Sequence, residues 1–224
     1  MIEILAHRGN LFGSDCQREN NASACKECLD LGFGLELDVR NYKNNLYAKH
    51  DPVTSDKAQY WAEIVEILIN YPQLTIAINI KDTGNENSLI TSIRNLSWFK
   101  VFLFDLELVV GIENYNSLTS VYKSLDSKIE IAIRASDKGE PLERAIESTS
   151  KVVWLDEFDN FWVSQQVIEK LNLAGKKVYA VAPDLHKHSA NISMTRCQEF
   201  AAWNVAGICT DYPIMLRNLL KGIT

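Results

Sequence analysis

Eight short apolar runs rich in β-branched residues recur along the chain, and a more polar stretch with helical spacing follows each of them. This alternation is typical of βα units around a parallel sheet. The predicted strands are 2–6, 34–39, 74–80, 101–106, 129–134, 152–155, 177–182 and 207–210. The predicted helices are 19–32, 57–70, 86–97, 113–125, 141–148, 161–174, 193–204 and 212–221.

Several of these helices carry start or stop signals. Asp56 precedes the second helix as a predicted N-cap, and Pro141 suits the first turn of the fifth. Gly32 and Gly175 stand where the first and sixth helices should end, because glycine readily adopts the left-handed conformation that closes a helix.

Eight strands, eight helices and no linker rich in Pro, Gly or Ser predict one α/β domain over residues 1–224, a (β/α)8 TIM barrel. The alternative is a doubly wound open sheet. Neither GxGxxG nor GxxxxGK[ST] follows any strand, and polar residues stand at nearly every strand end, which favours the barrel. Between residues 41 and 51 the pair Asn44-Asn45 predicts a tight turn, and therefore a small β-hairpin insertion after the second strand.

Composition narrows the classes of function. The chain has 224 residues, of which 46% are hydrophobic, and a formal net charge of −6. This acidic balance disfavours nucleic-acid partners and anionic membranes, although a local basic pocket can still bind one phosphate. No apolar stretch approaches the roughly 18 residues of a membrane span. The sequence leaves the oligomeric state open.

Five cysteines at irregular spacing fit a disulfide framework poorly. They fit a reducing compartment, so we expect a cytoplasmic protein. Cys25 and Cys28 form a CxxC pair without a second ligand pair at metal spacing, and we expect them to pack on one side of the first helix.

Two histidines, an arginine and two carboxylates stand at the ends of the first two predicted strands. His7 and Arg8 follow the first strand, Glu36 and Asp38 close the second, and His50 follows the hairpin. Strand alternation puts Glu36 and Asp38 on one face, where they could bind a divalent cation. An arginine offers a planar fork to a phosphate, and two imidazoles can act as base and acid near neutral pH. The set suggests a phosphate-ester site.

Nearly every later strand also ends in polar side chains. In a barrel these ends meet at one mouth, where a charged residue is more often functional than on a helix face. These further candidates are Asn79, Lys81, Asp105, Arg134, Asp156, Asp184, His186 and Asp211. His186 could line the pocket or cap the following helix. The aromatic residues around the sixth strand end, Trp154, Phe158, Phe161 and Trp162, are expected to pack that helix or line the pocket.

The order of these motifs resembles the glycerophosphodiester phosphodiesterase family, which is related to phosphatidylinositol-specific phospholipase C. The resemblance is closest over about the first 85 residues and looser in later segments, which resemble a bacterial phosphodiesterase-like branch. The motifs that carry it are His7-Arg8-Gly9, Arg18-Glu19-Asn20, Glu36-Leu37-Asp38, His50-Asp51 and Ile80-Lys81, then Trp154-Leu155-Asp156, Pro183-Asp184-Leu185-His186 and Cys209-Thr210-Asp211-Tyr212-Pro213.

The resemblance implies a role for each matching residue. His7 and His50 would be the catalytic acid and base, and Glu36 and Asp38 would bind Mg²⁺ or Ca²⁺. The substrate-binding residues would be Arg8 and Lys81, with Glu19 bracing Arg8. His186 is a further substrate-binding candidate from its position alone, not from the resemblance. The implied reaction has two steps: a neighbouring substrate hydroxyl attacks phosphorus, and water then opens the cyclic phosphate.

One position departs from the family pattern. The family places a third metal-binding glutamate two residues before the lysine, where this chain has Asn79. An amide oxygen can still bind Mg²⁺ or Ca²⁺, but the substitution removes a full negative charge. Asp105, at the end of the next strand, is a candidate to supply that charge.

Three functions therefore remain open. The first is a metal-dependent phosphodiesterase acting on a small or lipid-derived phosphodiester. The second is a phosphate-ester-binding or regulatory barrel whose turnover is lost with the third carboxylate. The third is another barrel enzyme, such as a sugar-phosphate lyase or isomerase that uses Lys81. Glu36 and Asp38 could also be a structural pair bonded to Arg8 and Lys81.

Overall fold

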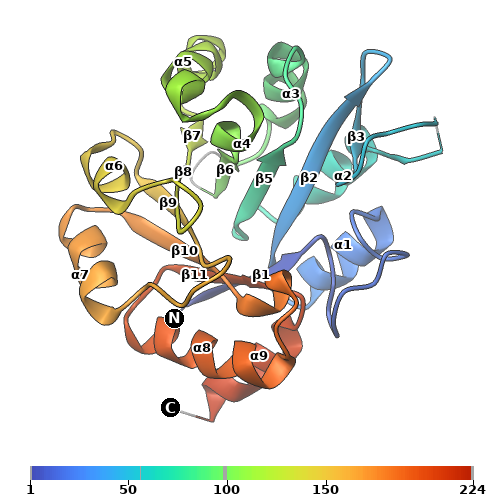
Figure 1. The fold of residues 1–224 in the computed structure, drawn as a ribbon. Coiled ribbons are helices and arrows are strands. Elements are labelled where there is room, and N and C mark those ends of the chain that lie inside the picture. Colours follow the sequence, from blue (N-terminus) through green and yellow to red (C-terminus); the bar gives the residue numbers. More distant parts are fainter. Residues whose placement is uncertain (1, 56, 98–99, 223–224) are drawn as a thin grey trace.

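A parallel barrel forms the centre of the computed structural model, which describes residues 2–55, 57–97 and 100–222 (Figure 1). The segment 130–136 closes it, because β7 pairs with β6, β8 pairs with β9, and the Ala132 amide between them donates to the Leu103 carbonyl at 2.8 Å. The barrel strands are β1 (Glu3–His7), β2 (Gly34–Tyr42), β5 (Ile76–Ile80), β6 (Val101–Phe104), β7 (Glu130–Ile131), β8 (Ile133–Ser136), β9 (Val152–Asp156), β10 (Lys177–Val181) and β11 (Gly207–Thr210).

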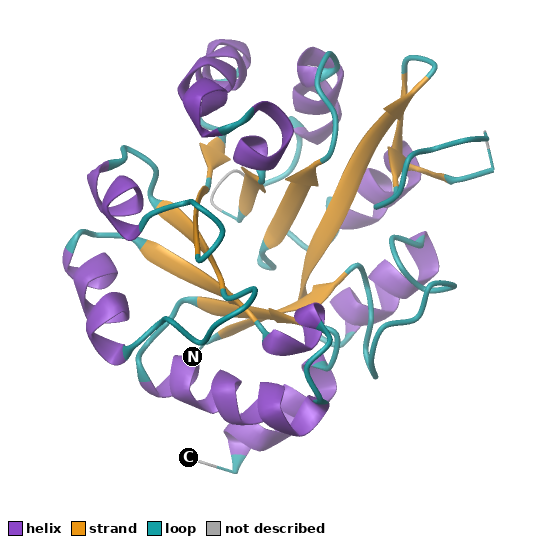
Figure 2. Ribbon diagram, in the orientation of Figure 1, coloured by secondary structure: helices purple, strands orange, loops and turns teal. Residues whose placement is uncertain are grey.

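Helices form a ring outside the strands (Figure 2). They are α1 (Ala22–Asp30), α2 (Trp61–Leu68), α3 (Glu86–Ile93), α4 (Leu106–Val110), α5 (Tyr115–Leu125), α6 (Leu142–Glu147), α7 (Gln165–Leu173), α8 (Ala190–Ala202) and α9 (Pro213–Lys221), with 3₁₀ turns at Ile112–Asn114 and Pro183–His186. Among the described helices, none is long and apolar enough to cross a membrane.

The predicted (β/α)8 TIM barrel is confirmed. Each predicted strand is present, and the fifth corresponds to β7 and β8 together. Gly32 and Gly175 take positive φ values, 80° and 73°, just after α1 and α7. Pro141 stands directly before α6, one position earlier than predicted. The second helix begins at Trp61 rather than at 57, and Asp56, its predicted N-cap, lies outside the described residues.

The hairpin after the second barrel strand is also present. β2 pairs antiparallel with β3 (Asn45–Ala48), and β3 pairs with the short β4 (Gln59–Tyr60). The turn lies at Lys43 and Asn44, one residue earlier than predicted, and both take positive φ values of 49° and 63°. A two-residue turn with positive φ at both positions has a backbone twist that matches the right-handed twist of the flanking strands.

Two apolar layers hold the barrel together. Inside it, the rings of Phe102, Phe104, Trp154 and Tyr179 stack on one another, so the centre is packed rather than open. Between strands and helices lies the larger layer, which buries Cys25 and Cys28 as expected for a packing role. Gly34 lets β2 approach the neighbouring chain, because a Cβ there would lie 2.5 Å from the Thr75 carbonyl oxygen.

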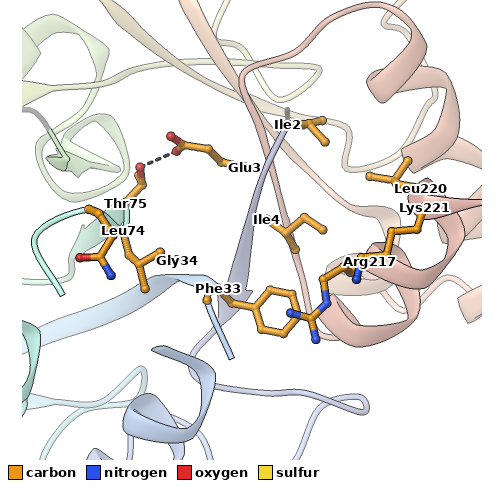
Figure 3. Close-up of a pocket in the computed structure, with 12 residues that line it drawn as sticks. Ile2, Glu3, Ile4, Phe33, Gly34, Leu74, Thr75, Arg217, Leu220 and Lys221 are labelled. Atoms are coloured by element: carbon orange, nitrogen blue, oxygen red, sulfur yellow. Dashed lines mark hydrogen bonds between the residues drawn. The ribbon is translucent and has the colours of Figure 1, made fainter. Parts of the chain in front are cut away.

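A cavity of about 380 Å³ lies where β1, β2 and β5 begin, at the end of the barrel away from His7 (Figure 3). Its walls are mostly apolar, and the Arg217 guanidinium stacks on the Phe33 ring at 4.2 Å. Its one acidic side chain, Glu3, accepts hydrogen bonds from Thr75, Lys100 and Tyr179. Groups at this end of a TIM barrel generally serve stability rather than catalysis.

Candidate active site

The turn after β1 aims two functional side chains into the mouth of the barrel. Arg8 and Gly9 both take positive φ values, 53° and 83°, so the chain reverses tightly as it leaves the strand. The Arg8 amide donates to the Glu36 carbonyl at 2.9 Å, and the Arg8 carbonyl accepts from the Asn20 amide at 2.7 Å. A left-handed arginine costs backbone energy, and such strain is concentrated at functional sites.

His7 is held by the carboxylate of the residue that directly follows the last strand of the barrel. Its Nδ1 lies 2.7 Å from Oδ1 of Asp211, and Asn10 Nδ2 donates to the same oxygen at 2.8 Å. Burial lowers the pKa of His7, but the hydrogen bond to Asp211 and the charge of Glu36 outweigh it, so the net pKa is raised. The Nε2 atom, which faces Glu36 at 3.8 Å, is therefore the one available for chemistry.

Two cations meet at Asp38. Arg8 Nε lies 2.9 Å from Oδ2, and Lys81 Nζ lies 3.2 Å from Oδ1. Asn20 Nδ2 also donates to Oδ2, and Glu19 accepts from Arg8 Nη1 at 3.0 Å, as the bracing prediction requires. Burial raises the pKa of Asp38, but Lys81 and Arg8 bring it below its ordinary value. The result is a pair of positively charged groups fixed side by side.

Glu36 lies beside this pair without a cation of its own. Burial and the nearby charge of Asp38 raise its pKa to about 7, although His7 and Arg8 act in the opposite direction. A carboxyl group in this state exchanges its proton near neutral pH. Arg8 and Lys81 form their ion pairs with Asp38, whereas the Glu36 carboxylate faces the His7 imidazole at 3.8 Å.

The three residues expected to bind a metal each carry one buried oxygen without a hydrogen-bond partner among the described residues. These atoms are Oε2 of Glu36, Oδ1 of Asp38 and Oδ1 of Asn79, and the Asp38 atom is also the one that faces Lys81. Asp38 and Asn79 stand opposite each other in the β2–β5 register. Oxygen atoms are the donors that Mg²⁺ and Ca²⁺ take, so this set fits such a cation.

The same set is short of negative charge. Over residues 2–55, 57–97 and 100–222, no three His, Cys, Asp or Glu side chains gather as a metal site, so a site here depends on the amide of Asn79. Asp105 does not supply the missing charge, because its carboxylate pairs with Arg134.

His50 stands apart from this contact network. Its side chain is 44% exposed on the segment after β3, and Nδ1 lies 3.0 Å from the exposed Asp51. With Glu19 and Asn20 it lines a cavity of about 360 Å³ beside the mouth. The hairpin thus brings His50 to the edge of the site, as predicted, but within the described residues no hydrogen bond or ion pair joins it to His7.

A second polar cluster occupies the rest of the mouth. Arg134, whose side chain is 4% exposed, forms ion pairs with Asp105 and Asp156. Asp156 Oδ1 also lies 2.5 Å from Nε2 of His186. His186 therefore belongs to this cluster and makes no direct contact with Arg8 or Lys81 among the described hydrogen bonds.

Sequence reasoning missed the residues that orient the others. Asp211 was only one of several strand-end acids, and no role was predicted for Asn10 or Asn20. One signal was present for Asp211: the first and last strands of a closed barrel are neighbours, and Ala6 pairs with Thr210 in the β1–β11 register. Asn20 lies in the Arg18-Glu19-Asn20 motif, but that motif gave it no role, and Asn10 stands in no motif.

Comparisons with known proteins find relatives by structure only: no family model matches the chain, and no curated sequence does. A glycerophosphodiester phosphodiesterase from Agrobacterium tumefaciens superposes with a TM-score of 0.67 at 17% identity, over 97% of this chain and all of that one. A glycerophosphoryl diester phosphodiesterase from Parabacteroides distasonis gives 0.70 at 15% identity, over 100% and 87%. Phosphoribosyl anthranilate isomerase from Thermus thermophilus, another barrel, gives 0.57 at 8% over both whole chains.

The phosphodiesterases score above the isomerase although all cover the chain almost completely. At these identities the likeness concerns the fold. The barrel fold that the resemblance to the glycerophosphodiester phosphodiesterase family implies is thus confirmed, because solved phosphodiesterases superpose on almost the whole chain.

Proposed function

We propose that the protein is a phosphodiesterase that hydrolyses small phosphodiesters at the mouth of its barrel. The observation that carries the proposal is the arrangement around Asp38, which fixes Arg8 and Lys81 together next to a partly buried His7 that a carboxylate holds in place. Two adjacent cationic side chains can bind the two negatively charged, non-bridging oxygens of a phosphodiester. The phosphodiesterase neighbours support the same class of reaction.

His7 and His50 would transfer the protons of a two-step reaction. In the first step, a neighbouring hydroxyl of the substrate gives its proton to one imidazole while its oxygen bonds to phosphorus. The bond to the departing alcohol breaks, and that alcohol takes a proton from the other imidazole. In the second step, water adds to the cyclic phosphate, the ring opens, and both imidazoles return to their first protonation states. Arg8 and Lys81 would stabilise the charge that develops on the phosphoryl oxygens.

Glu36, Asp38 and Asn79 would hold a Mg²⁺ or Ca²⁺ ion through their three buried oxygens. Such an ion would supply further charge neutralisation at the phosphate. Lys81 is already close to Asp38, so phosphate binding that draws Lys81 away would free an oxygen of Asp38 for the ion.

Hydrolysis of glycerophosphocholine and of glycerophosphoethanolamine tests this function directly, because the glycerol of both substrates carries the neighbouring hydroxyl that attacks phosphorus in the first step. The wild-type protein should release product in the presence of Mg²⁺ or Ca²⁺, and His7→Ala should lower kcat at least 100-fold, because general acid–base groups contribute about 10²–10⁴-fold. His188→Ala is the matched control, since His188 stacks on Phe161 away from His7. Equal rates for the wild type and His7→Ala would refute the proposal.

A second candidate is a barrel that binds phosphate esters without turnover. Two observations favour it: Asn79 replaces a carboxylate in the oxygen set, and His50 is half exposed rather than buried against the site. Calorimetry with glycerol phosphate separates the two. Binding that is lost in Arg8→Met, in a protein that hydrolyses neither diester with either cation, would establish this alternative.

A further inference from the structure

Arg217, on α9, is a half-buried cation that no described carboxylate neutralises. Its Nη1 donates to the Leu31 carbonyl at 2.7 Å, just after α1. Its Nε is buried without a hydrogen-bond partner, and Nη2 donates to no other described residue. The guanidinium charge therefore meets one carbonyl oxygen and the face of the Phe33 ring.

The other arginines of the described chain are placed differently. Arg94 is exposed at the end of α3, where water solvates its charge. Each of the rest forms an ion pair with an aspartate or glutamate: Arg8, Arg18, Arg40, Arg134, Arg144 and Arg196. Removing a charge from water is costly unless an opposite charge meets it. Arg217 thus has the environment of an anion-binding residue.

The cavity of about 380 Å³ at the start of β1, β2 and β5 lies directly beside this guanidinium. Figure 3 shows Arg217 next to the ring of Phe33, which also lines the cavity. The apolar walls come from separate parts of the chain, with Ile4 on β1, Leu74 before β5 and Leu220 on α9. The volume falls within the roughly 300–1,000 Å³ of small-molecule sites, which are mostly apolar with a few polar groups.

The acidic residue on the cavity wall is not a partner for Arg217. Glu3 forms its ion pair with Lys100 and accepts further hydrogen bonds from Thr75 and Tyr179. Figure 3 shows its carboxylate turned toward Thr75. The charge of Glu3 is therefore already balanced, and the charge of Arg217 is left for a ligand.

The walls and the guanidinium together define the chemistry of that ligand. The planar fork of an arginine matches a carboxylate, and the apolar walls favour a hydrocarbon body. A sugar would leave hydroxyls unpaired against Ile4 and Leu220, which is unfavourable. A doubly charged phosphate ester is disfavoured by the Glu3 carboxylate on the same wall.

We propose that this cavity binds a small apolar carboxylate, with the carboxylate on Arg217 and the hydrocarbon body between Ile4, Phe33 and Leu220. The site lies at the end of the barrel away from His7, so the inference goes beyond the proposed function and does not depend on it.

Calorimetry with octanoate and 1-octanol tests the proposal, because the two probes share a hydrocarbon chain and differ in charge. Octanoate should bind the wild type at one site per chain, about tenfold more tightly than 1-octanol, since hydrogen bonds between charged groups are the stronger ones. Arg217→Met should weaken octanoate about tenfold and change the affinity for 1-octanol less than threefold. Arg94→Met, which removes an exposed arginine, should match the wild type.

A second variant locates the bound probe independently of Arg217. Leu220→Trp fills the cavity and should weaken octanoate and 1-octanol alike at least tenfold, whereas Leu173→Trp, on a side chain 89% exposed, should weaken neither. Absence of saturable octanoate binding to the wild type would overturn the proposal, as would equal octanoate affinity in the wild type and either Arg217→Met or Leu220→Trp. Competition between octanoate and glycerol phosphate would also overturn it, because it would place octanoate at the mouth.

Discussion

Nδ1 of His7 lies 2.7 Å from Oδ1 of Asp211, a contact that joins the first barrel strand to the last. Asp211 is itself fixed, because Asn10 donates to the same oxygen and the Asp211 amide donates to Asp184 at 2.8 Å. The carboxylate thus sets both the tautomer and the direction of the imidazole. Within the described part of the chain, His50 contacts the exposed carboxylate of Asp51 instead.

Asp211→Asn should therefore impair catalysis far more than folding. An amide there can stabilise the wrong tautomer of His7, and we expect kcat to fall about 10²–10⁴-fold, by analogy with other histidine–aspartate pairs. The pKa of His7 should also fall, since Asp211 is the main group raising it. Steady-state kinetics and histidine NMR titration measure both effects. Asp30→Asn, at the exposed end of α1, is the control, and a kcat within threefold of wild type in Asp211→Asn would contradict the assigned role.

The strands were predictable because the barrel buries them on both faces. Val101–Phe104 and Val152–Asp156 are buried throughout, so each reads as a continuous apolar run. The five residues of α4 were not predicted, because a helix of little more than one turn is too short to display a period. Its entry at Asp105, in the left-handed conformation, has no sequence signal either.

Site residues could be predicted from the sequence where they stand together in one short motif at the end of a strand. His7-Arg8-Gly9 and Glu36-Leu37-Asp38 each place neighbouring residues on one strand end, and β1 pairs with β2, so their meeting follows from topology. The pairing of His186 with Asp156 depends on side-chain direction after two different strands, which no spacing encodes. The same holds for Asp105, whose pairing with Arg134 instead of the predicted metal position depends on the packed structure.

Glu36 should make stability depend on pH near neutrality. Its pKa in the fold is about 7, against an ordinary value of 4.5, so the folded state binds this proton more tightly than the unfolded chain. Stability should therefore decrease as pH rises from about 5 to 8 in EDTA, by up to about 3 kcal/mol. The raised pKa of His7 acts in the same direction, since its favourable charge is lost as pH rises through its folded pKa.

Glu36→Gln should remove most of this decrease, because a neutral amide has no proton to lose. Urea unfolding at pH 5 and pH 8 gives the two free energies of unfolding, and their difference should be smaller in the variant. Glu66→Gln, on the exposed side of α2, should keep the wild-type difference. Parallel pH profiles for the wild type and Glu36→Gln would show that Glu36 is not the group responsible.

Asn79→Glu should strengthen the proposed cation site. In EDTA the new carboxylate faces Asp38 across the β2–β5 register, so the variant should melt below the wild type. A cation at about 100 times its dissociation constant should then raise the melting temperature by roughly 5–10 °C. Asn79→Gln provides the uncharged control. An identical response to Mg²⁺ and Ca²⁺ in the wild type and Asn79→Glu would mean that position 79 does not face the cation.

Arg134→Met should destabilise the barrel more than any exposed charge deletion. The variant leaves Asp105 and Asp156 buried without their shared cation, and removing one partner of a buried ion pair costs about 3–5 kcal/mol. The loss should be smaller at pH 4 than at pH 8, because a protonated carboxyl tolerates burial. Adding Asp105→Asn to Arg134→Met should restore part of the stability, whereas Arg94→Met, at the exposed end of α3, should change it by less than about 0.5 kcal/mol. Urea unfolding of the four proteins measures these differences, and a loss in Arg134→Met that does not vary with pH would mean that packing, rather than charge, accounts for it.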